Sequence, residues 1–408
     1  MSTIIDRRTD FSDLISPMRD NDEPVYNWHA FKHSYSRELV LKLAEEFGLQ
    51  KGAWVMDPFC GGGTTLLALR ELGINSHGYD ILPFSVFLSN VKTRNYDYPE
   101  LLEVRGRFRV RKTISIDIPG LEQVPIAKKA FTPRVKEELV RLKQWIEEIE
   151  DPVCRDFYNL ALLNIVESVS KTSKAGGFLR FRRSVVRPQS VQRAFLRRAD
   201  AMIRDVRQFH ENLRWTNTRS EAFLADARRL ETSKSYDAII TSPPYPNRHD
   251  YSRIYSLEML FDFVKSNDEL KAIRYQTLRS HVEARKRFAC NEYSKSARLT
   301  RLLREIENNG TNNCRVVSML EGYFEDMYIA LKGWIRSLRK GGHIALVVSN
   351  VRFAGVSVPV DELLAEVGDS AGLTTKAIYV ARLRGNSPQQ MKRYSRVPSR
   401  ESIVIWEK

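Results

Sequence analysis

The chain is organised around a stretch near its middle, Tyr236 to Tyr245, which reads Tyr-Asp-Ala-Ile-Ile-Thr-Ser-Pro-Pro-Tyr. Its apolar residues, Ala238 to Ile240, predict a short strand buried in a parallel sheet. Pro243 and Pro244 end that strand, because a proline has no backbone donor. The result is a stiff loop at the carboxyl end of a strand, where open α/β sheets bind their ligands. Its hydroxyl, carbonyls and aromatic ring suit a planar group that carries an NH2.

A second stretch has the pattern of a nucleotide-binding turn. A strand from Trp54 to Asp57 and an apolar helix from Leu66 to Leu72 enclose the sequence Asp-Pro-Phe-Cys-Gly-Gly-Gly-Thr-Thr, residues 57–65. Strand, glycine-rich turn and helix in this order form the first unit of a nucleotide-binding sheet. Glycines let the backbone approach a ligand closely. No lysine follows the last glycine, so the turn lacks the phosphate-loop pattern.

One helix later, Ile74 to Asp80 predicts the second strand, which ends in a carboxylate. Asp80 is placed to accept hydrogen bonds from both ribose hydroxyls of an adenosine ligand. The alternative is that Asp80 caps the next helix. Its spacing from Gly63 favours the ligand role.

These motifs resemble those of the DNA amino-methyltransferases, which methylate adenine N6 or cytosine N4. Ser242-Pro243-Pro244-Tyr245 resembles their catalytic tetrapeptide, whose serine-headed form is most typical of the cytosine-N4 enzymes. Taken alone, four residues could also be a proline-rich turn. The glycine stretch resembles the first S-adenosylmethionine motif of the same family. Many serine-headed enzymes place the tetrapeptide before the glycine motif, whereas here it comes after, which weakens the assignment of the subclass.

The resemblance implies S-adenosylmethionine as the cofactor and assigns the site residues. Asp226, at the end of a strand from Ser220, corresponds to the acceptor for the adenine amino group, or else is a polar strand end. Ser36, the expected N-cap of a helix from Arg37 to Phe47, belongs to a segment beside the methionine moiety. The implied catalytic residues are Ser242, Pro243, Pro244 and Tyr245, and the implied cofactor residues are Asp57, Pro58, Phe59, Gly61, Gly63, Thr64, Asp80, Asp226 and Ser36.

The implied fold is α/β: a class I, Rossmann-like methyltransferase sheet that ends in an antiparallel hairpin and carries two mainly helical basic insertions. We expect the hairpin at Thr374 to Leu383 and Glu401 to Trp406, with a polar loop, Arg384 to Gln390, near the flipped base. The expected core segments are 1–98 (cofactor part), 215–265 (catalytic loop) and 323–408 (completion of the sheet), and the insertions are 99–214 and 266–322.

Charge points to a polyanionic partner. The 408 residues include 65 Lys and Arg against 50 Asp and Glu, a net charge of +15, which favours nucleic acid over an acidic small molecule. Basic and aromatic residues interleave in Lys171 to Arg183, and Leu101 to Ile118 reads as a half-exposed strand with a basic face. The alternative for such runs is a solvated face. The expected nucleic-acid contacts are Lys174, Arg180, Arg182, Arg183, Arg248, Arg274 and Arg279.

The sequence therefore predicts a site-specific methyltransferase that flips a cytosine out of duplex DNA and methylates its N4 atom, as part of a restriction-modification system. Adenine N6, structured RNA and a non-catalytic binding protein are the alternatives. We expect no metal, because the four cysteines are scattered without ligand spacing. We expect no membrane segment and a cytoplasmic, nucleoid-associated protein, with a separate cognate endonuclease as a further partner.

Overall fold

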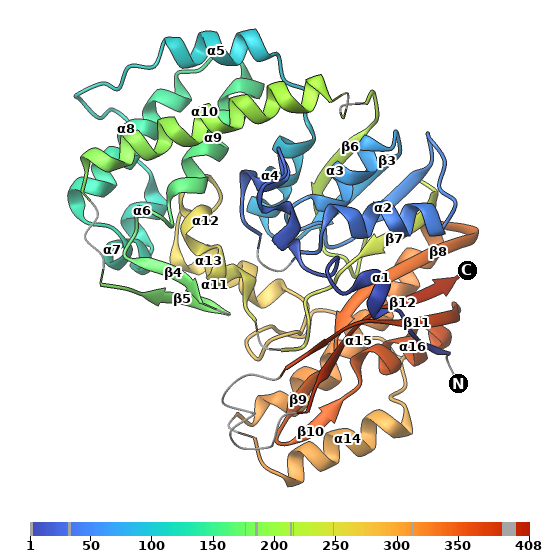
Figure 1. Cartoon of the computed structure of the whole chain (residues 1–408). Helices are drawn as coiled ribbons and strands as arrows, with labels where there is room; N and C mark the ends of the chain where they lie inside the picture. The colour runs from blue at the N-terminus through green and yellow to red at the C-terminus, as the bar shows by residue number, and fades with distance from the viewer. Residues whose placement is uncertain are drawn as a thin grey trace.

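The computed structural model describes residues 3–31, 34–175, 177–183, 187–212, 214, 216–247, 249–311, 313–385 and 397–408. A sheet of eight strands crosses the molecule in the order β6-β3-β2-β7-β8-β12-β11-β1 (Figure 1). The strands are β1 (Ile4–Asp6), β2 (Trp54–Asp57), β3 (Asn75–Asp80), β6 (Ser220–Leu224), β7 (Tyr236–Thr241), β8 (Leu338–Ser349), β11 (Thr374–Arg384) and β12 (Ser399–Glu407).

The sheet is parallel except at its last hairpin. β12 runs antiparallel to both β8 and β11, whereas β6, β3, β2, β7 and β8 are parallel neighbours. This is the class I methyltransferase arrangement that the resemblance implies, and the predicted terminal hairpin is confirmed. β1 pairs in parallel with β11 and extends the sheet by one edge strand that the sequence analysis did not predict.

Helices cover both faces of the sheet. One face packs against α2 (Arg37–Glu46), α3 (Thr64–Glu71) and α4 (Pro83–Thr93), the other against α15 (Arg315–Ser337) and α16 (Val360–Ala371). β8 shows why both faces are buried: Ala345 and Val347 enter the first core cluster, and Leu346 and Val348 enter the second. Side chains alternate along a strand, so a stretch that is apolar at every position, such as Ile344 to Val348, must be covered on both faces of the sheet.

The segment from about 99 to 214 forms the lobe at the upper left of Figure 1 and is mainly helical. The shorter segment from 266 to 322 contributes α13 (Asn267–Gln276) and α14 (Ala297–Asn308). None of the described helices is long and apolar enough to cross a membrane. The elements of the upper lobe are α5 (Tyr98–Gly106), α6 (Pro119–Gln123), α7 (Pro125–Ala130), α8 (Pro133–Glu147), α9 (Pro152–Ile165), β4 (Thr172–Ala175), β5 (Phe178–Phe181) and α10 (Gln189–Glu211).

Short elements complete the chain. Helices α11 (Tyr251–Ile254) and α12 (Ser256–Asp262) follow the predicted catalytic loop, and the strands β9 (Val351–Phe353) and β10 (Val356–Val358) pair as a small hairpin after β8. Near the N-terminus lie α1 (Arg8–Phe11) and the 3-10 turns η1 (Pro17–Asn21) and η2 (Tyr26–Trp28).

The predicted strand at Leu101 to Ile118 is wrong. Its first part belongs to α5, because Asp97 caps that helix by accepting from the Glu100 amide at 2.9 Å and Pro99 occupies its first turn. The rest, as far as Ile118, is irregular. The basic and apolar residues of this stretch alternate, but a helix start signal just before them decided the local structure.

Candidate active site

The glycine turn joins β2 to α3 and is shaped by close packing. A Cβ atom at Gly61 or Gly62 would lie within 2.9 Å of the Phe31 side chain. Gly63 has a φ of 76°, and a Cβ there would meet Ser89 at 2.9 Å. Only glycine fits such positions. Asp57 is buried beneath the turn and accepts from the Phe59 amide at 3.1 Å and from the Thr241 hydroxyl at 2.6 Å.

Asp80 ends β3 beside this turn, as predicted. Its carboxylate accepts from the backbone amides of Gly61 at 3.0 Å and Leu82 at 2.9 Å, one on each oxygen. A carboxylate has about four acceptor positions, so two remain for a pair of ligand hydroxyls. Burial raises the pKa of Asp80 to about 6, and the nearby Asp57 carboxylate adds to that rise. Burial likewise raises the pKa of Asp57 to about 6.

A cleft of about 910 Å³, counting its open mouth, lies at the carboxyl ends of these strands. Its size and mixed lining suit a small-molecule ligand. Nine of the predicted residues line it: Asp57, Pro58, Phe59, Gly61, Thr64, Asp80, Asp226, Ser242 and Pro244. The glycine cradle and the two open acceptor positions of Asp80 fit the adenosine part of S-adenosylmethionine.

Ser36 does not line the cleft. It is fully buried, and its hydroxyl accepts from the Leu39 amide at 3.4 Å as the N-cap of α2. The preceding residues, Ser34 and Tyr35, line the cleft instead. They are held by hydrogen bonds to the threonines of the glycine turn, Ser34 to Thr64 at 3.1 Å and Tyr35 to Thr65 at 2.6 Å. The segment around Ser36 therefore lies at the cleft as predicted, but Ser34 and Tyr35 line the cleft in place of Ser36. Gly63 shapes the turn without lining the cleft.

Asp226 lines the cleft but is engaged by two arginines. Arg228 donates to both of its oxygens, from Nε at 2.8 Å and Nη2 at 2.7 Å, and also from its backbone amide at 3.1 Å. Arg287 adds a fourth donor at 2.9 Å. These four donors fill the acceptor positions of the carboxylate. An adenine amino group would replace Arg287, whose side chain is 35% exposed, rather than Arg228, which is 1% exposed.

The predicted catalytic loop follows β7 directly. Ser242 Oγ lies 3.0 Å from the Val347 carbonyl, to which it donates, and 3.4 Å from the Tyr245 hydroxyl. A serine hydroxyl has one proton and two lone pairs, so donation to Val347 leaves acceptor capacity at the cleft. Pro243 is buried and Tyr245 half-buried behind the lining. Burial, and the nearby Glu401 carboxylate, raise the pKa of Tyr245 to about 12, which keeps its ring neutral.

The second insertion also reaches the cleft, which the sequence analysis missed. Four residues just after α13 line it: Thr277, Leu278, Ser280 and His281. They lie in a polar, basic stretch without a recognisable ligand motif. Only the folded chain brings them to Asp226.

The predicted nucleic-acid residues separate into two groups. Three of them are in ion pairs away from solvent. The side chain of Lys174 is 3% exposed and pairs with Glu258, that of Arg274 is 13% exposed and pairs with Asp250 at 2.7 Å, and that of Arg279 is 10% exposed and pairs with Asp326 at 2.6 Å. A charge already paired in the interior is not available to a phosphate.

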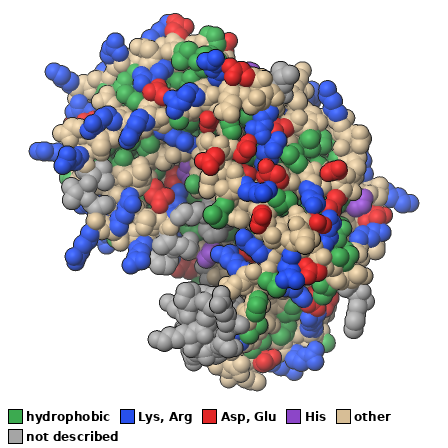
Figure 2. Space-filling model, in the orientation of Figure 1, with side chains coloured by type: hydrophobic (Ala, Val, Ile, Leu, Met, Phe, Trp, Pro, Cys, Tyr) green, Lys and Arg blue, Asp and Glu red, His purple; other side chains and the backbone are tan. Residues whose placement is uncertain are grey.

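Arg180, Arg182 and Arg183 are exposed on and just after the β4–β5 hairpin. Figure 2 shows Lys and Arg side chains spread over the same lobe. Arg248 lies outside the described residues, as does the 386–390 part of the predicted polar loop. Among the predicted nucleic-acid residues that the structure describes, Arg180, Arg182 and Arg183 are therefore the ones exposed enough to contact a phosphate.

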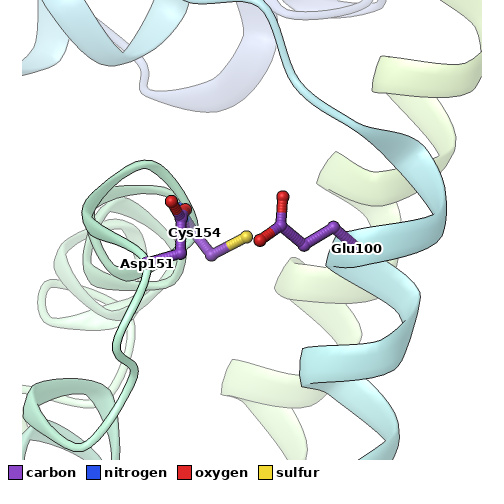
Figure 3. Close-up of side chains that lie close together, drawn as sticks. All are labelled: Glu100, Asp151 and Cys154. Atoms are coloured by element: carbon purple, nitrogen blue, oxygen red, sulfur yellow. The ribbon is translucent and has the colours of Figure 1, made fainter.

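Three potential metal ligands lie close together, away from the cleft: Glu100, Asp151 and Cys154 (Figure 3). Asp151 is the N-cap of α9 and accepts from the Cys154 amide at 2.6 Å. Burial, with the nearby Glu100 carboxylate, raises the pKa of the Cys154 thiol to about 12. Asp151 therefore acts as a helix cap in this cluster, and without a cation beside it the Cys154 thiol stays protonated.

The sheet order, the glycine cradle, the acidic residues at the ends of β3 and β6 and the loop after β7 define a class I methyltransferase. Comparison with known proteins gives the family. The chain is 30% identical to the type II methyltransferase M.BsoBI of Geobacillus stearothermophilus over a 451-residue alignment, which covers 97% of this chain and 88% of that protein. It is 28% identical to M.AvaI of Nostoc sp., over 97% and 89% of the two chains. The chain belongs to the type II DNA methyltransferases.

Members of this family use S-adenosylmethionine as the methyl donor, so it is the cofactor of this protein. They are the methyltransferases of restriction-modification systems. No protein-family profile matches the chain. Among solved structures, TrmN from Thermus thermophilus is similar over 94% of this chain and 52% of that one, with 10% identity and a TM-score of 0.31. A score this low gives no support for a shared function.

Proposed function

We propose that this DNA methyltransferase transfers the methyl group to the exocyclic N4 of cytosine in duplex DNA. The observation that carries the proposal is the hydrogen bond from Ser242 to the Val347 carbonyl at 3.0 Å. Because Ser242 lines the cleft and donates its only hydroxyl proton to that carbonyl, its lone pairs are proposed to accept from a group in the cleft. An amino group has hydrogens to donate, and we propose the Pro243 carbonyl, in the same loop, as the second acceptor.

The target nitrogen is a poor nucleophile, because its lone pair is delocalised into the ring. Two acceptors positioned for its hydrogens favour a pyramidal nitrogen with a more localised lone pair, and they are oriented before the reaction begins. The cofactor supplies an electrophilic methyl carbon on its sulfonium sulfur. With the cofactor bound, the nitrogen lone pair would form the new N–C bond as the methyl–sulfur bond breaks, the sulfur would keep that electron pair, and the amino group would lose one proton to solvent. Holding the two reactants in line supplies much of the remaining rate enhancement.

A base inside a duplex cannot reach this cleft, so the nucleotide must be flipped out. Tyr245 is the aromatic ring of the loop and is proposed to stack on the flipped base. Arg180, Arg182 and Arg183 are proposed to contact phosphates, which position the duplex without reading its sequence. In the proposed division of the chain, the segment 99–214 therefore carries DNA contacts. A separate cognate endonuclease is the proposed partner in the cell.

Serine at the head of the tetrapeptide supports cytosine, because the adenine-N6 members that this chain resembles usually have Asp or Asn there. The Ser242→Ala variant tests the role of the hydroxyl. It should bind S-adenosylhomocysteine like the wild type and lose turnover, because only a contact to the reacting nitrogen is removed. Ser370→Ala is the matched control, since Ser370 is exposed and its hydroxyl also donates to a backbone carbonyl, that of Val367 at 2.8 Å.

The product decides the target atom. Mass spectrometry of nucleosides from methylated DNA should detect N4-methylcytosine. N6-methyladenine as the sole product would overturn the cytosine assignment and leave the family and the cofactor unchanged.

A further inference from the structure

The segment Thr277 to His281, from the second insertion, lies against the adenine-side carboxylate of the cleft. Four of its five residues line the cleft, and the fifth, Arg279, points the other way. The residues on either side of the segment are joined to Asp226 and its neighbour Arg228 by two contacts. Arg228 donates to the Gln276 carbonyl at 2.6 Å, and Arg287 donates to Asp226 at 2.9 Å.

Asp326 of α15 holds this segment from behind. It is completely buried and accepts four hydrogen bonds: from Arg228 at 2.8 Å, and from the backbone amide, Nε and Nη2 of Arg279 at 3.0, 3.1 and 2.6 Å. Its acceptor positions are therefore full. The neighbouring Glu325 accepts from Arg279 and from Lys286, each at 2.9 Å. A fully paired buried carboxylate of this kind fixes geometry, because each filled acceptor position specifies where one donor must lie.

Gly322 of α15 makes room for the Arg279 side chain. A Cβ at this position would lie 2.7 Å from both Cδ and Nη1 of Arg279. That guanidinium cannot simply swing aside, since Asp326 and Glu325 hold it. Any displacement of Arg279 is passed along the backbone to Leu278 and Ser280, which are its immediate neighbours and line the cleft.

We propose that Thr277 to His281 is the adenine-side wall of the cofactor pocket, and that Gly322, Arg279 and Asp326 are positioning residues that set this wall. The second insertion thus serves the cofactor rather than the DNA. The inference rests on the proposed assignment of the cleft as the cofactor site.

The test compares two glycine-to-alanine variants in one helix. Gly322→Ala displaces Arg279, whereas Gly333→Ala, also in α15, meets nothing closer than 3.8 Å. Alanine favours a helix interior over glycine in both variants, so neither loses helix stability. Calorimetry with S-adenosylhomocysteine and no DNA should show affinity weakened by about tenfold for Gly322→Ala, comparable to losing one or two ligand hydrogen bonds, and unchanged for Gly333→Ala.

Three further measurements make the result decisive. Asp80→Ala tests the cleft itself. If it weakens binding while folded Gly322→Ala binds like the wild type, the proposed role of Thr277 to His281 is refuted, but the assignment of the cleft as the cofactor site is not. If neither variant changes the affinity, the cofactor site is wrong. Loss of DNA affinity alone in Gly322→Ala would also refute the inference. If Gly322→Ala does not fold, Arg279→Lys, which keeps the charge and loses the bidentate fork, takes its place with the same expected outcomes.

Hydrogen exchange gives an independent readout. S-adenosylhomocysteine should slow amide exchange in the segment 277–281 of the wild-type protein, because a ligand against the wall opposes local opening. Equal exchange with and without the ligand would contradict the proposed contact.

Discussion

Asp80 gives the sharpest quantitative prediction about the cofactor site. Two of its acceptor positions are taken by the amides of Gly61 and Leu82, which leaves two for ribose hydroxyls. A hydrogen bond to a charged group contributes about 1.5–3 kcal/mol, and about 1.4 kcal/mol corresponds to a tenfold change in affinity. Asp80→Ala should therefore weaken binding of S-adenosylhomocysteine by more than about tenfold, even if water replaces part of what is lost.

Calorimetry without DNA measures this directly. Asp117→Ala, which removes an exposed carboxylate far from the cleft residues in sequence, is the control and should bind like the wild type. Circular dichroism must show both variants folded. Unchanged affinity in a folded Asp80→Ala protein would refute the reasoning, because the predicted loss comes entirely from the two open acceptor positions of this carboxylate.

Three further predictions concern pH, DNA and stability. Because burial raises the pKa of Asp80 to about 6, the carboxylate is protonated below that pH and cofactor affinity should fall as the pH drops through it. Asp80→Asn should flatten this pH dependence in calorimetric titrations; a step that persists would implicate Asp57, whose pKa is also about 6. Replacing Arg180, Arg182 and Arg183 by glutamine should reduce the slope of log affinity for DNA against log salt by about 0.9 per lost phosphate contact, and an unchanged slope would make them a solvated face. Lys174→Met should lower the free energy of unfolding by about 3–5 kcal/mol, because it leaves Glu258 buried without its ammonium partner. In urea titrations, adding Glu258→Gln to this variant should recover part of the loss. No recovery would argue against the ion pair as the cause.

The buried ion pair between Lys174 and Glu258 also explains why the density of basic residues wrongly suggested a DNA contact at Lys174. Burial by itself would raise the pKa of Glu258, but Lys174 and His29 lower it to about 2. Burial, with Lys174 nearby, lowers the pKa of His29 to about 4, so the histidine is neutral at physiological pH and Lys174 is the cation that balances Glu258. The lysine therefore anchors the β4–β5 hairpin to α12, while the arginines beside it on the hairpin are exposed.

The sequence by itself determined the elements whose signal is local. Short apolar runs and the turn residues behind them predicted β2 and β7 close to their observed bounds, since a buried strand needs apolar residues on both faces. Ser36 was predicted as a helix cap because a cap is read from a few adjacent residues, and its hydroxyl does accept from the Leu39 amide at the start of α2. The motif residues of the glycine turn, Asp80 and the catalytic loop meet in one cleft because all of them follow the carboxyl ends of parallel strands.

Only the tertiary structure decided which charges are free and what completes the pocket. Lys174 lies 84 positions from Glu258, and Arg279 lies 47 positions from Asp326. No local pattern marks such partners, because an ion pair depends on distance in space and on burial, not on spacing along the chain. For the same reason, the sequence places Thr277 to His281 only within a basic insertion, whereas the fold places them in the same cleft as Asp226. Hydrophobic periodicity reports which face of an element is buried, but the partners of a polar side chain are set by how the elements pack.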